Sequence, residues 1–327
     1  MKVYIVGRGA VGTYLGDQLS GIGVEVAYAP RSLRDVTPFA ADVAIVATKA
    51  YDTDGAIETL RAAIPDLKNC VFVTPQNGVG NEEKLVAAFG ADNVVAAALT
   101  VPVDRDRNGQ VTAAKDGGLA FAPVGASAFN WLVATFASSG LKVKVVDDWR
   151  ALKWSKLALN VVANASCAIL NVLPNRLVHF DKVFTLEIRM IREVRAVMAA
   201  MNITPIDLPR YPTKALFTAA ALPSAVARRV MAGRIAGARG TKPPSLLLDL
   251  RQGKPQSEVE FLNGAVAAAG LAHGVPTPVN AVYARVLDDI ANMPQLWAKY
   301  RERPEALLAE VEAEMERTRA LTKGAHR

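Results

Sequence analysis

Three polar side chains at a four-residue spacing mark the stretch of the chain that is best suited to chemistry. In "WSKLALNVVAN", Lys156, Asn160 and Asn164 stand among residues that are almost all apolar. At about 100° per residue, this spacing drifts by only about 80° in all, so one helix would carry the three as a single polar stripe. A buried cation and two buried amides are costly unless they are paired. A bound substrate oxygen could pair them, and so could neighbouring backbone in a structural amide network.

The lysine of this stripe could act as a proton donor. Burial disfavours a charged ammonium and lowers its pKa, so Lys156 could release a proton near neutral pH. Reduction of a carbonyl needs such a donor, because hydride reaches the carbon while the oxygen takes a proton. The stripe therefore favours a carbonyl reductase.

A glycine-rich segment near the N-terminus, "VYIVGRGAVG", predicts dinucleotide binding. Its glycines follow a β-branched run and open a helical pattern, which is the setting that the G-x-G-x-x-G fingerprint requires. The first glycine permits a tight turn, the second lets the pyrophosphate approach, and the third lets helix pack on strand, while the helix N-terminus attracts the phosphates. A glycine-rich turn without a ligand is the alternative. The predicted cofactor-binding residues of this segment are Gly7, Arg8, Gly9, Ala10, Val11 and Gly12.

The end of the second expected strand, "VEVAYAPRS", bears on which dinucleotide is bound. Arg31 stands where an NAD-binding unit carries an acid, and no carboxylate follows before Asp35. A guanidinium grips a 2′-phosphate, whereas an acid would repel it, so NADP is favoured over NAD. Lys49, directly after the apolar run "DVAIVAT", could help to neutralise the cofactor phosphates. For both side chains, an ordinary exposed position is the alternative.

Two more segments contribute candidates. Asn77 in "TPQNGVG" follows a strand, at the sheet edge where ligands bind, although Asn-Gly is also a common turn. Ser245 comes after two prolines and is expected to be a helix N-cap. The run "SEVE" at 257–260 predicts a capping box, in which Glu260 reaches back to the cap while Glu258 remains available for a site.

Composition narrows the class of protein. With 327 residues and 51% hydrophobic content, the chain can form two cores, and its net charge of +7 is scattered, which argues against a nucleic-acid surface and fits a small anionic ligand. Cys70 and Cys167 lie in apolar runs and are expected to be reduced. The three histidines share no ligand spacing, so no metal site is predicted. There is no signal-peptide pattern and no membrane-length apolar run, so we expect a cytoplasmic protein without a membrane partner.

The elements that must position these residues change character near residue 148. Before it, strands alternate with helical patterns over 10–21, 54–63 and 81–89, which predicts an α/β Rossmann-like N-terminal domain with a mostly parallel sheet over 1–148. After it, only helical spacing recurs, which predicts an all-α C-terminal domain over 149–327. The apolar helices there could form a homodimer face or simply a core. The helical segments expected in this domain are 151–170, 183–201, 213–232, 245–251, 257–270, 278–292 and 304–320.

Taken together, the chain resembles the ketopantoate reductases (2-dehydropantoate 2-reductases), within the 6-phosphogluconate-dehydrogenase-like group. The likeness runs nearly end to end and is carried by "GRGAVG", "TKA", "QNGVG", "WSKLALNVVAN" and "SEVEFLNG". It implies reduction of 2-dehydropantoate to pantoate by NADPH, a step of pantothenate and coenzyme A biosynthesis. Family members carry a longer segment than the dozen residues at 30–41, so NAD stays an alternative cofactor.

The resemblance also implies roles for single residues. Lys156 looks like the general acid that protonates the keto oxygen, and Glu258 resembles a carboxylate close to the cofactor and that lysine. Arg31 and Lys49 resemble the pair that recognises the 2′-phosphate, and Asn77 resembles the amide that meets both nicotinamide ribose and substrate. The implied substrate-binding residues are Asn77, Asn160, Asn164, Asn175 and Ser245.

Two other functions remain open at this point. A related enzyme could reduce a different 2-keto acid with the same lysine and asparagines. A non-catalytic NADP-binding sensor is the second alternative, and the presence of Lys156 and Glu258 argues against it, because a sensor needs no proton donor.

Overall fold

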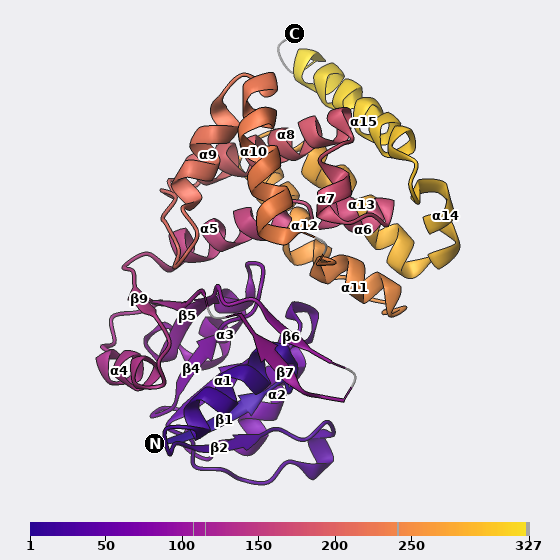
Figure 1. Ribbon diagram of the computed structural model, residues 1–327. Coiled ribbons are helices and arrows are strands. Elements are labelled where there is room, and N and C mark those ends of the chain that lie inside the picture. The colour runs from indigo at the N-terminus through magenta and orange to yellow at the C-terminus, as the bar shows by residue number, and fades with distance from the viewer. Residues whose placement is uncertain (107, 115, 241, 325–327) are drawn as a thin grey trace. The chain divides into compact units, whose positions relative to one another are not determined.

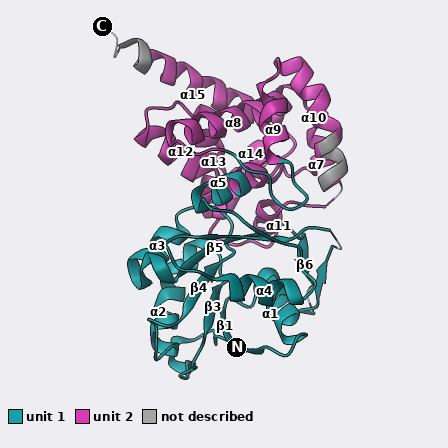
Figure 2. Cartoon of the chain, turned by 90° about the vertical axis from the view of Figure 1, so that its left-hand side faces the viewer, with its two compact units in different colours: residues 1–156, 205–212 teal, residues 157–204, 213–327 magenta. Residues whose placement is uncertain are grey.

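The structure is a computed structural model that describes residues 1–106, 108–114, 116–240 and 242–324. The chain separates into two compact units (Figure 2): unit 1 is Met1–Lys156 with Pro205–Pro212, and unit 2 is Leu157–Thr204 with Thr213–Arg327. The domain boundary expected between 148 and 149 coincides with the start of helix α5 (Trp149–Val161), whereas the two units divide inside that helix.

In the described part of unit 1, seven strands form one sheet in the order β2-β1-β3-β4-β5-β8-β9. Figure 1 labels β1, β2, β4, β5 and β9 of this sheet. The first five are parallel to one another, β8 runs antiparallel to β5, and β9 is parallel to β8. A separate antiparallel pair is formed by β6 and β7. The bounds are β1 Lys2–Val6, β2 Glu25–Tyr28, β3 Val43–Val46, β4 Val71–Thr74, β5 Val94–Leu99, β6 Val103–Arg105, β7 Val111–Ala113, β8 Leu119–Pro123 and β9 Val143–Val145.

Both faces of this sheet are covered by helices, which explains why its central strands are apolar throughout. Helices α1 (Ala10–Ser20) and α4 (Asn130–Ser138) pack on one face together with Ile5, and α2 (Thr53–Ala63) and α3 (Asn81–Phe89) pack on the other. Side chains of consecutive residues in β1 therefore pack into different cores: Ile5 packs against α1 and α4, whereas Tyr4 and Val6 pack on the side of α2 and α3. The prediction of a Rossmann-like domain with a mostly parallel sheet is confirmed.

Strand β1 lies between β2 and β3, so the chain leaves β1 in one direction through α1 and later returns to its other side. In open α/β sheets, such a reversal of strand order leaves a crevice outside the carboxyl ends of the strands. The glycine loop after β1 and residues 47–49 after β3 meet at this place.

Unit 2 is built of helices in its described part, as predicted for the C-terminal domain. Helix α13 (Pro278–Asn292) lies at its centre and contacts α6, α8, α12 and α15. No helix in the described residues is both long enough and apolar enough to span a membrane. The other bounds are α6 Ala165–Leu170, α7 Pro174–Leu177, α8 Asp181–Ala200, α9 Thr213–Ala221, α10 Ser224–Arg239, α11 Ser245–Arg251, η4 Glu258–Phe261, α12 Asn263–Ala272, η5 Pro294–Leu296, α14 Trp297–Tyr300 and α15 Pro304–Gly324.

Three helices that the sequence predicts as continuous are interrupted. The segment 213–232 divides into α9 and α10 at Pro223, which has no N–H to continue a helix. The segment 257–270 starts with the 3₁₀ turn η4 before α12 begins. The segment 151–170 breaks after Val161, because Ala163 adopts a left-handed φ of 49°.

The left-handed conformation of Ala163 is stabilised by a side chain of another helix, α8. The carboxylate of Glu187 on α8 is fully buried, and its Oε2 accepts a hydrogen bond of 2.6 Å from the Ala163 N–H. An L-residue in this region costs roughly 1–2 kcal/mol, so the bond offsets a local strain. The break between α5 and α6 is therefore fixed by tertiary structure.

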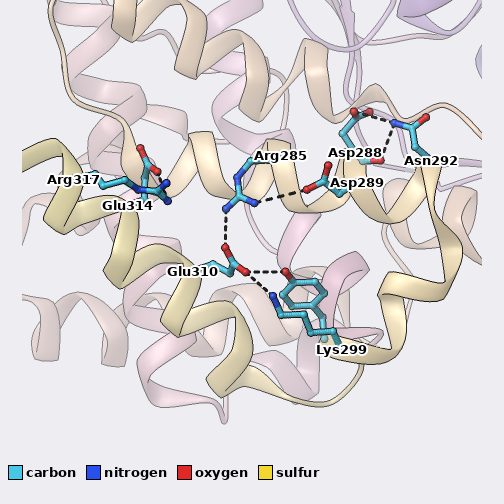
Figure 3. A network of polar contacts seen from close by, with 9 residues as sticks. Arg285, Asp288, Asp289, Asn292, Lys299, Glu310, Glu314 and Arg317 are labelled. Carbon is cyan, nitrogen blue, oxygen red and sulfur yellow. Dashed lines mark hydrogen bonds and ion pairs between the residues drawn. The ribbon is translucent and has the colours of Figure 1, made fainter.

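A polar cluster, the Glu310 cluster, joins α13, α14 and α15 (Figure 3). The Glu310 carboxylate accepts from Lys299 Nζ at 2.7 Å, Arg285 Nη2 at 2.8 Å and Tyr300 OH at 3.1 Å. These donors, Lys299 first, lower the pKa of Glu310 to about 2. The cluster ties the last helix of the described chain to the centre of unit 2.

Candidate active site

A cavity of about 1070 Å³ opens in unit 1 at the carboxyl ends of β1 and β3. Three arginines, Arg8, Arg31 and Arg105, line it together with the carboxylates of Asp52 and Glu58. Its place agrees with the crevice that the strand order predicts.

The glycine loop leaves room for a ligand at one point only. Gly7 has a φ of 104°, and a Cβ there would lie 2.5 Å from the carbonyl carbon of Ala47. A Cβ on Gly12 would lie 2.0 Å from the Gly7 oxygen, so both glycines are required by close packing. Above Gly9, by contrast, nothing lies within 4 Å of an added Cβ. The open space at the start of α1 fits the pyrophosphate of a dinucleotide.

The arginines of the cavity differ in how they are held. Arg8 lies over the Tyr28 ring, with its guanidinium carbon 4.8 Å from the ring centroid. Arg105 Nη1 donates to the Arg8 carbonyl at 2.8 Å, which ties β6 to the glycine loop. Arg31 is exposed in the loop after β2. The sequence reasoning missed Arg105, because no motif marks it and only the fold brings β6 beside the loop.

Lys49 follows the cavity residue Thr48 and is half-buried. Its backbone carbonyl accepts from the N–H of Asp52, in a 3₁₀ turn, η2 (Ala50–Asp52), that leads into α2. Burial raises the pKa of the Asp52 carboxyl, and the charge of Lys49 opposes that shift. The two side chains therefore interact electrostatically at the edge of the cavity.

The buried side chain of Gln76 holds the turn after β4 in place through hydrogen bonds. Its side chain is buried, and its Nε2 donates to Thr48 Oγ1 at 3.1 Å and to Thr53 Oγ1 at 3.0 Å. Its Oε1 accepts from Thr74 Oγ1 at 3.0 Å. This amide joins the ends of β3 and β4 to the start of α2, so it holds the edge of the sheet on which Asn77 sits.

The turn around Asn77, residues 74–80, is held at two consecutive backbone carbonyls. Asn81 Nδ2 donates to the Asn77 carbonyl at 3.2 Å, and Lys153 Nζ donates to the Gln76 carbonyl at 2.6 Å. Gly78 takes a left-handed φ of 82°. The Asn77 side chain itself is half-buried. Buried donors thus define the backbone from which this predicted site residue projects.

Lys153 belongs to a fully buried ion pair that the sequence reasoning missed. Its Nζ lies 2.8 Å from Glu82 Oε1, and the two side chains are 1% and 0% exposed. Burial raises the pKa of the Glu82 carboxyl, although the charge of Lys153 acts against this. A signal was available: Lys153 stands in a helix whose neighbouring residues are nearly all apolar, where a cation needs a partner.

Lys156, the predicted proton donor, is half-buried and lies one turn after Lys153 on α5. The preceding residue, Ser155, is buried and accepts at Oγ from the Ile206 N–H at 3.0 Å, which binds 205–212 to unit 1. Asn160 follows Lys156 by one further turn of the same helix and is also half-buried.

Asn164 is not the third member of a helical stripe, and that part of the sequence prediction is wrong. It lies beyond the end of α5, because the chain turns at Ala163, and it precedes α6. Its side chain is 4% exposed; Nδ2 donates to the Asn160 carbonyl at 3.0 Å and to Ser245 Oγ at 3.4 Å. Unit 2 therefore brings Asn160, Asn164 and Ser245 together through contacts within the protein.

Ser245 is the first residue of α11 rather than its N-cap, a position that Pro244 occupies. The capping function falls to a distant residue, since Asn164 Oδ1 accepts from the Leu246 N–H at 3.1 Å. The amide of Asn164 thereby satisfies one of the unpaired donors at the helix start. Because the amide of Asn164 is engaged in these bonds, Ser245 is the exposed residue among Asn160, Asn164 and Ser245.

The remaining two predicted residues lie on other segments of unit 2. Asn175, on α7, is exposed, and its N–H donates to the Gly240 carbonyl at 3.4 Å. Glu258 opens η4 and is only 5% exposed. Burial of an acid at this place sets it apart from an ordinary helix-start carboxylate on the surface.

The predicted capping box before α12 is wrong in its details. Ser257 Oγ does accept a backbone hydrogen bond, but from Val259 at 3.2 Å instead of from Glu260. Glu260 is exposed, and its side chain makes no return bond to Ser257 in the described part of the chain. The tighter 3₁₀ turn brings the second N–H, not the third, within reach of the serine.

Comparisons with known proteins match both units. The model of the family described as "Ketopantoate reductase PanE/ApbA" matches residues 20–126, and that of its C-terminal part matches residues 148–291. The 2-dehydropantoate 2-reductase of Pyrobaculum aerophilum is 30% identical over 236 residues, 72% of each chain. That of Caulobacter vibrioides is 29% identical over 270 residues, 81% of each chain.

Solved structures agree with this. A PanE/ApbA family ketopantoate reductase from Ralstonia eutropha is 27% identical and superposes with a TM-score of 0.74 over 90% of this chain and 100% of its own. A D-mandelate dehydrogenase in complex with NADH, 20% identical, has a TM-score of 0.73 over 89% of this chain and 99% of its own, which shows a common fold. With matches to both family models and a 30% identical relative, this chain belongs to the ketopantoate reductase family.

Proposed function

We propose that the protein reduces 2-dehydropantoate to pantoate with NADPH. The observation that carries the proposal is the arginine-lined cavity beside Gly7 and Arg8, at the strand reversal and next to the open space at Gly9, in a chain of this family. The relatives support the substrate, since those from Pyrobaculum aerophilum and Caulobacter vibrioides are 2-dehydropantoate 2-reductases.

The cavity fits the cofactor by shape and charge. NADPH, when bound, supplies the hydride. The glycine loop and the N-terminus of α1 would bind its pyrophosphate, and Arg31 with Lys49 would bind its 2′-phosphate. Arg105 adds a guanidinium to the same cavity. The proposed cofactor-binding residues are Gly7, Arg8, Gly9, Ala10, Val11, Gly12, Arg31, Lys49, Asn77 and Glu258.

Lys156 would donate the proton. Its ammonium would place a proton on the keto oxygen while negative charge develops there, which stabilises the transition state. Glu258, a buried carboxylate of unit 2, would act as the second catalytic group, the role that the family resemblance implies for it.

Substrate binding would rest on short polar side chains. Asn160 and Ser245 would bind the hydroxyl and carboxylate of the substrate, and Asn77 would bind substrate and ribose. Asn164, whose amide bonds are made to Asn160, Ser245 and Leu246, would hold Ser245 in place. Asn175 is the remaining proposed contact.

A steady-state screen tests the function. Purified protein is assayed for oxidation of NADPH and of NADH with 2-dehydropantoate and with other 2-keto acids. We expect 2-dehydropantoate and NADPH to give the highest kcat/KM. A protein that oxidises neither cofactor with any 2-keto acid would be a binding protein, and a preference for another keto acid would change the substrate.

A homodimer is also proposed, since a fold neighbour with a TM-score of 0.70 is a dimeric ketopantoate reductase from Staphylococcus aureus. Light scattering coupled to size exclusion measures this directly. A mass equal to one chain at micromolar concentration would refute it. A cytoplasmic location stays a prediction from the sequence.

A further inference from the structure

We propose that Lys153 and Glu82 are a positioning pair, which fixes the Asn77 turn against α5 and so sets the Asn77 backbone relative to Lys156. The inference rests on the proposed function, in which Asn77 and Lys156 both act. All of these residues belong to unit 1.

Lys153 has the geometry of a joint between elements. Its ammonium faces three oxygens: Glu82 Oε1 at 2.8 Å, the Gln76 carbonyl at 2.6 Å and the Ala97 carbonyl at 3.5 Å. The ammonium donates hydrogen bonds to the two carbonyls, and its contact with Glu82 is an ion pair. One side chain of α5 thereby reaches α3, the Asn77 turn and β5.

The cost of the pair argues that it does more than stabilise the fold. Two charges that are 1% and 0% exposed have lost their hydration, and such pairs are often no better for stability than apolar residues of the same size. In the described part of the chain, neither carboxylate oxygen of Glu82 has a hydrogen-bond partner, although Oε1 lies in an ion pair 2.8 Å from Lys153 Nζ, so the desolvation is incompletely offset. Apolar residues could fill this space, but they could not hold the Gln76 carbonyl.

The sequence positions explain what the pair would control. The Gln76 carbonyl belongs to the peptide bond that leads into Asn77, and Asn81 holds the Asn77 carbonyl on the other side. On α5, residues three apart are neighbours on the surface of the helix, so fixing Lys153 also fixes the base of Lys156. The Gln76 carbonyl thus lies next to Asn77 in the chain, and Lys153 lies one helical turn before Lys156.

A double substitution separates positioning from stability. In Lys153→Met with Glu82→Leu, both charges are replaced by apolar groups, so we expect a urea-unfolding free energy close to that of the wild type. The hydrogen bond to the Gln76 carbonyl is lost, and kcat with 2-dehydropantoate should fall at least about tenfold. The Kd of NADPH, measured by fluorescence, should change less than about twofold.

The ion pair Lys84–Asp54 provides a matched control. It joins α3 to α2 at 2.7 Å, but its side chains are 36% and 72% exposed. Lys84→Gln with Asp54→Asn should leave both kcat and stability near the wild-type values, because an exposed pair contributes little. A fall of kcat in the control as large as in the buried pair would show that any loss of charge in unit 1 is harmful, and would overturn the proposal.

A second variant covers the case in which the double variant fails to fold. Lys153→Gln with Glu82→Gln leaves no charge buried without its partner, so it should fold; because the shorter amide at position 153 does not reach the Gln76 carbonyl as the ammonium does, kcat should fall several-fold with NADPH binding intact. Wild-type kcat in either well-folded variant overturns the positioning role while the proposed function stands. A wild-type protein without activity on 2-dehydropantoate overturns the function, and the catalytic role of the pair with it.

Discussion

Two carboxylates of this protein meet lysines at nearly the same distance, yet they behave in opposite ways. Glu82 lies 2.8 Å from Lys153 in unit 1, and Glu310 lies 2.7 Å from Lys299 in unit 2. Burial raises the pKa of Glu82, whereas the donors around Glu310 lower its pKa to about 2. The difference is solvent: Glu82 is 0% exposed, while Glu310 is 21% and Lys299 55% exposed.

We infer from this contrast that the two ion pairs contribute differently to the stability of the fold. In the Glu310 cluster the charges keep part of their hydration, so the hydrogen bonds add to the stability of unit 2. In the buried pair the same attraction works against a large desolvation cost, and its net gain for folding is small. We therefore expect catalysis to change when the buried pair is replaced as a whole or when its neighbour Lys156 is substituted, and stability alone to change in the Glu310 cluster.

The largest effect is expected beside the buried pair. Lys156→Ala removes the proposed proton donor, and general acid catalysis contributes roughly 10²–10⁴-fold, so kcat should fall by that factor. The Kd of NADPH should stay within about twofold, and the unfolding free energy should hardly change, because Lys156 is half-buried. Stopped-flow kinetics measures the rate of NADPH oxidation, and fluorescence titration measures the Kd of NADPH. A variant that keeps a tenth or more of the wild-type kcat would show that Lys156 is not the proton donor.

The next effect comes from breaking the buried pair on one side only. Lys153→Met leaves the Glu82 carboxylate buried without its counter-charge, which should lower the unfolding free energy by about 3–5 kcal/mol. Urea unfolding measures this loss. Adding Glu82→Leu should restore most of it; if the double variant is as unstable as the single one, the pair does stabilise the fold and the comparison fails.

A smaller effect, on stability alone, is expected from Glu310→Gln. Because its partners are about half exposed, we expect a loss of about 1–2 kcal/mol, less than its lowered pKa would suggest. The folded pKa of about 2 lies below the ordinary glutamate value of 4.5, so this contribution is complete above pH 4.5 and is lost as the pH falls towards 2. Unfolding curves between pH 6 and pH 2 should show a shallower slope in the variant, at unchanged kcat near neutral pH.

The smallest effect belongs to the outermost pair of the same region. Arg317 lies 3.0 Å from Glu314, one turn along α15, and its side chain is 62% exposed (Figure 3). Arg317→Gln should change the unfolding free energy by no more than about 0.5 kcal/mol. A loss equal to that of Glu310→Gln would mean that exposure does not decide the value of these pairs.

Local patterns in the sequence were enough for the fold and for part of the site. The alternation of apolar strands and helical segments predicts the parallel sheet, and the glycine spacing predicts the loop in which Gly7 and Gly12 are packed and Gly9 is open. Asn77 could be placed at the sheet edge because strand β4 ends at Thr74, three residues before it. Each of these features depends on neighbours close in the chain.

The features that sequence reasoning missed depend on distant partners. The break that removes Asn164 from α5 is held by Glu187, 24 residues away, and no residue near Ala163 signals a left-handed turn. The bond between Lys153 and the turn spans 77 residues. Arg105 reaches the glycine loop from a strand 97 residues later. Such contacts follow only from the folded chain.

The central claim, that the chain is a reductase delivering hydride to a keto carbon, is tested most directly by isotope transfer. The wild-type protein is supplied with 2-dehydropantoate and NADPH in which both hydrogens of the nicotinamide C4 are deuterium, and the product is analysed by mass spectrometry and NMR. We predict pantoate that carries one deuterium at C2, formed in equal amount to the NADP produced. Unlabelled pantoate, or NADPH that stays unoxidised, would contradict the account.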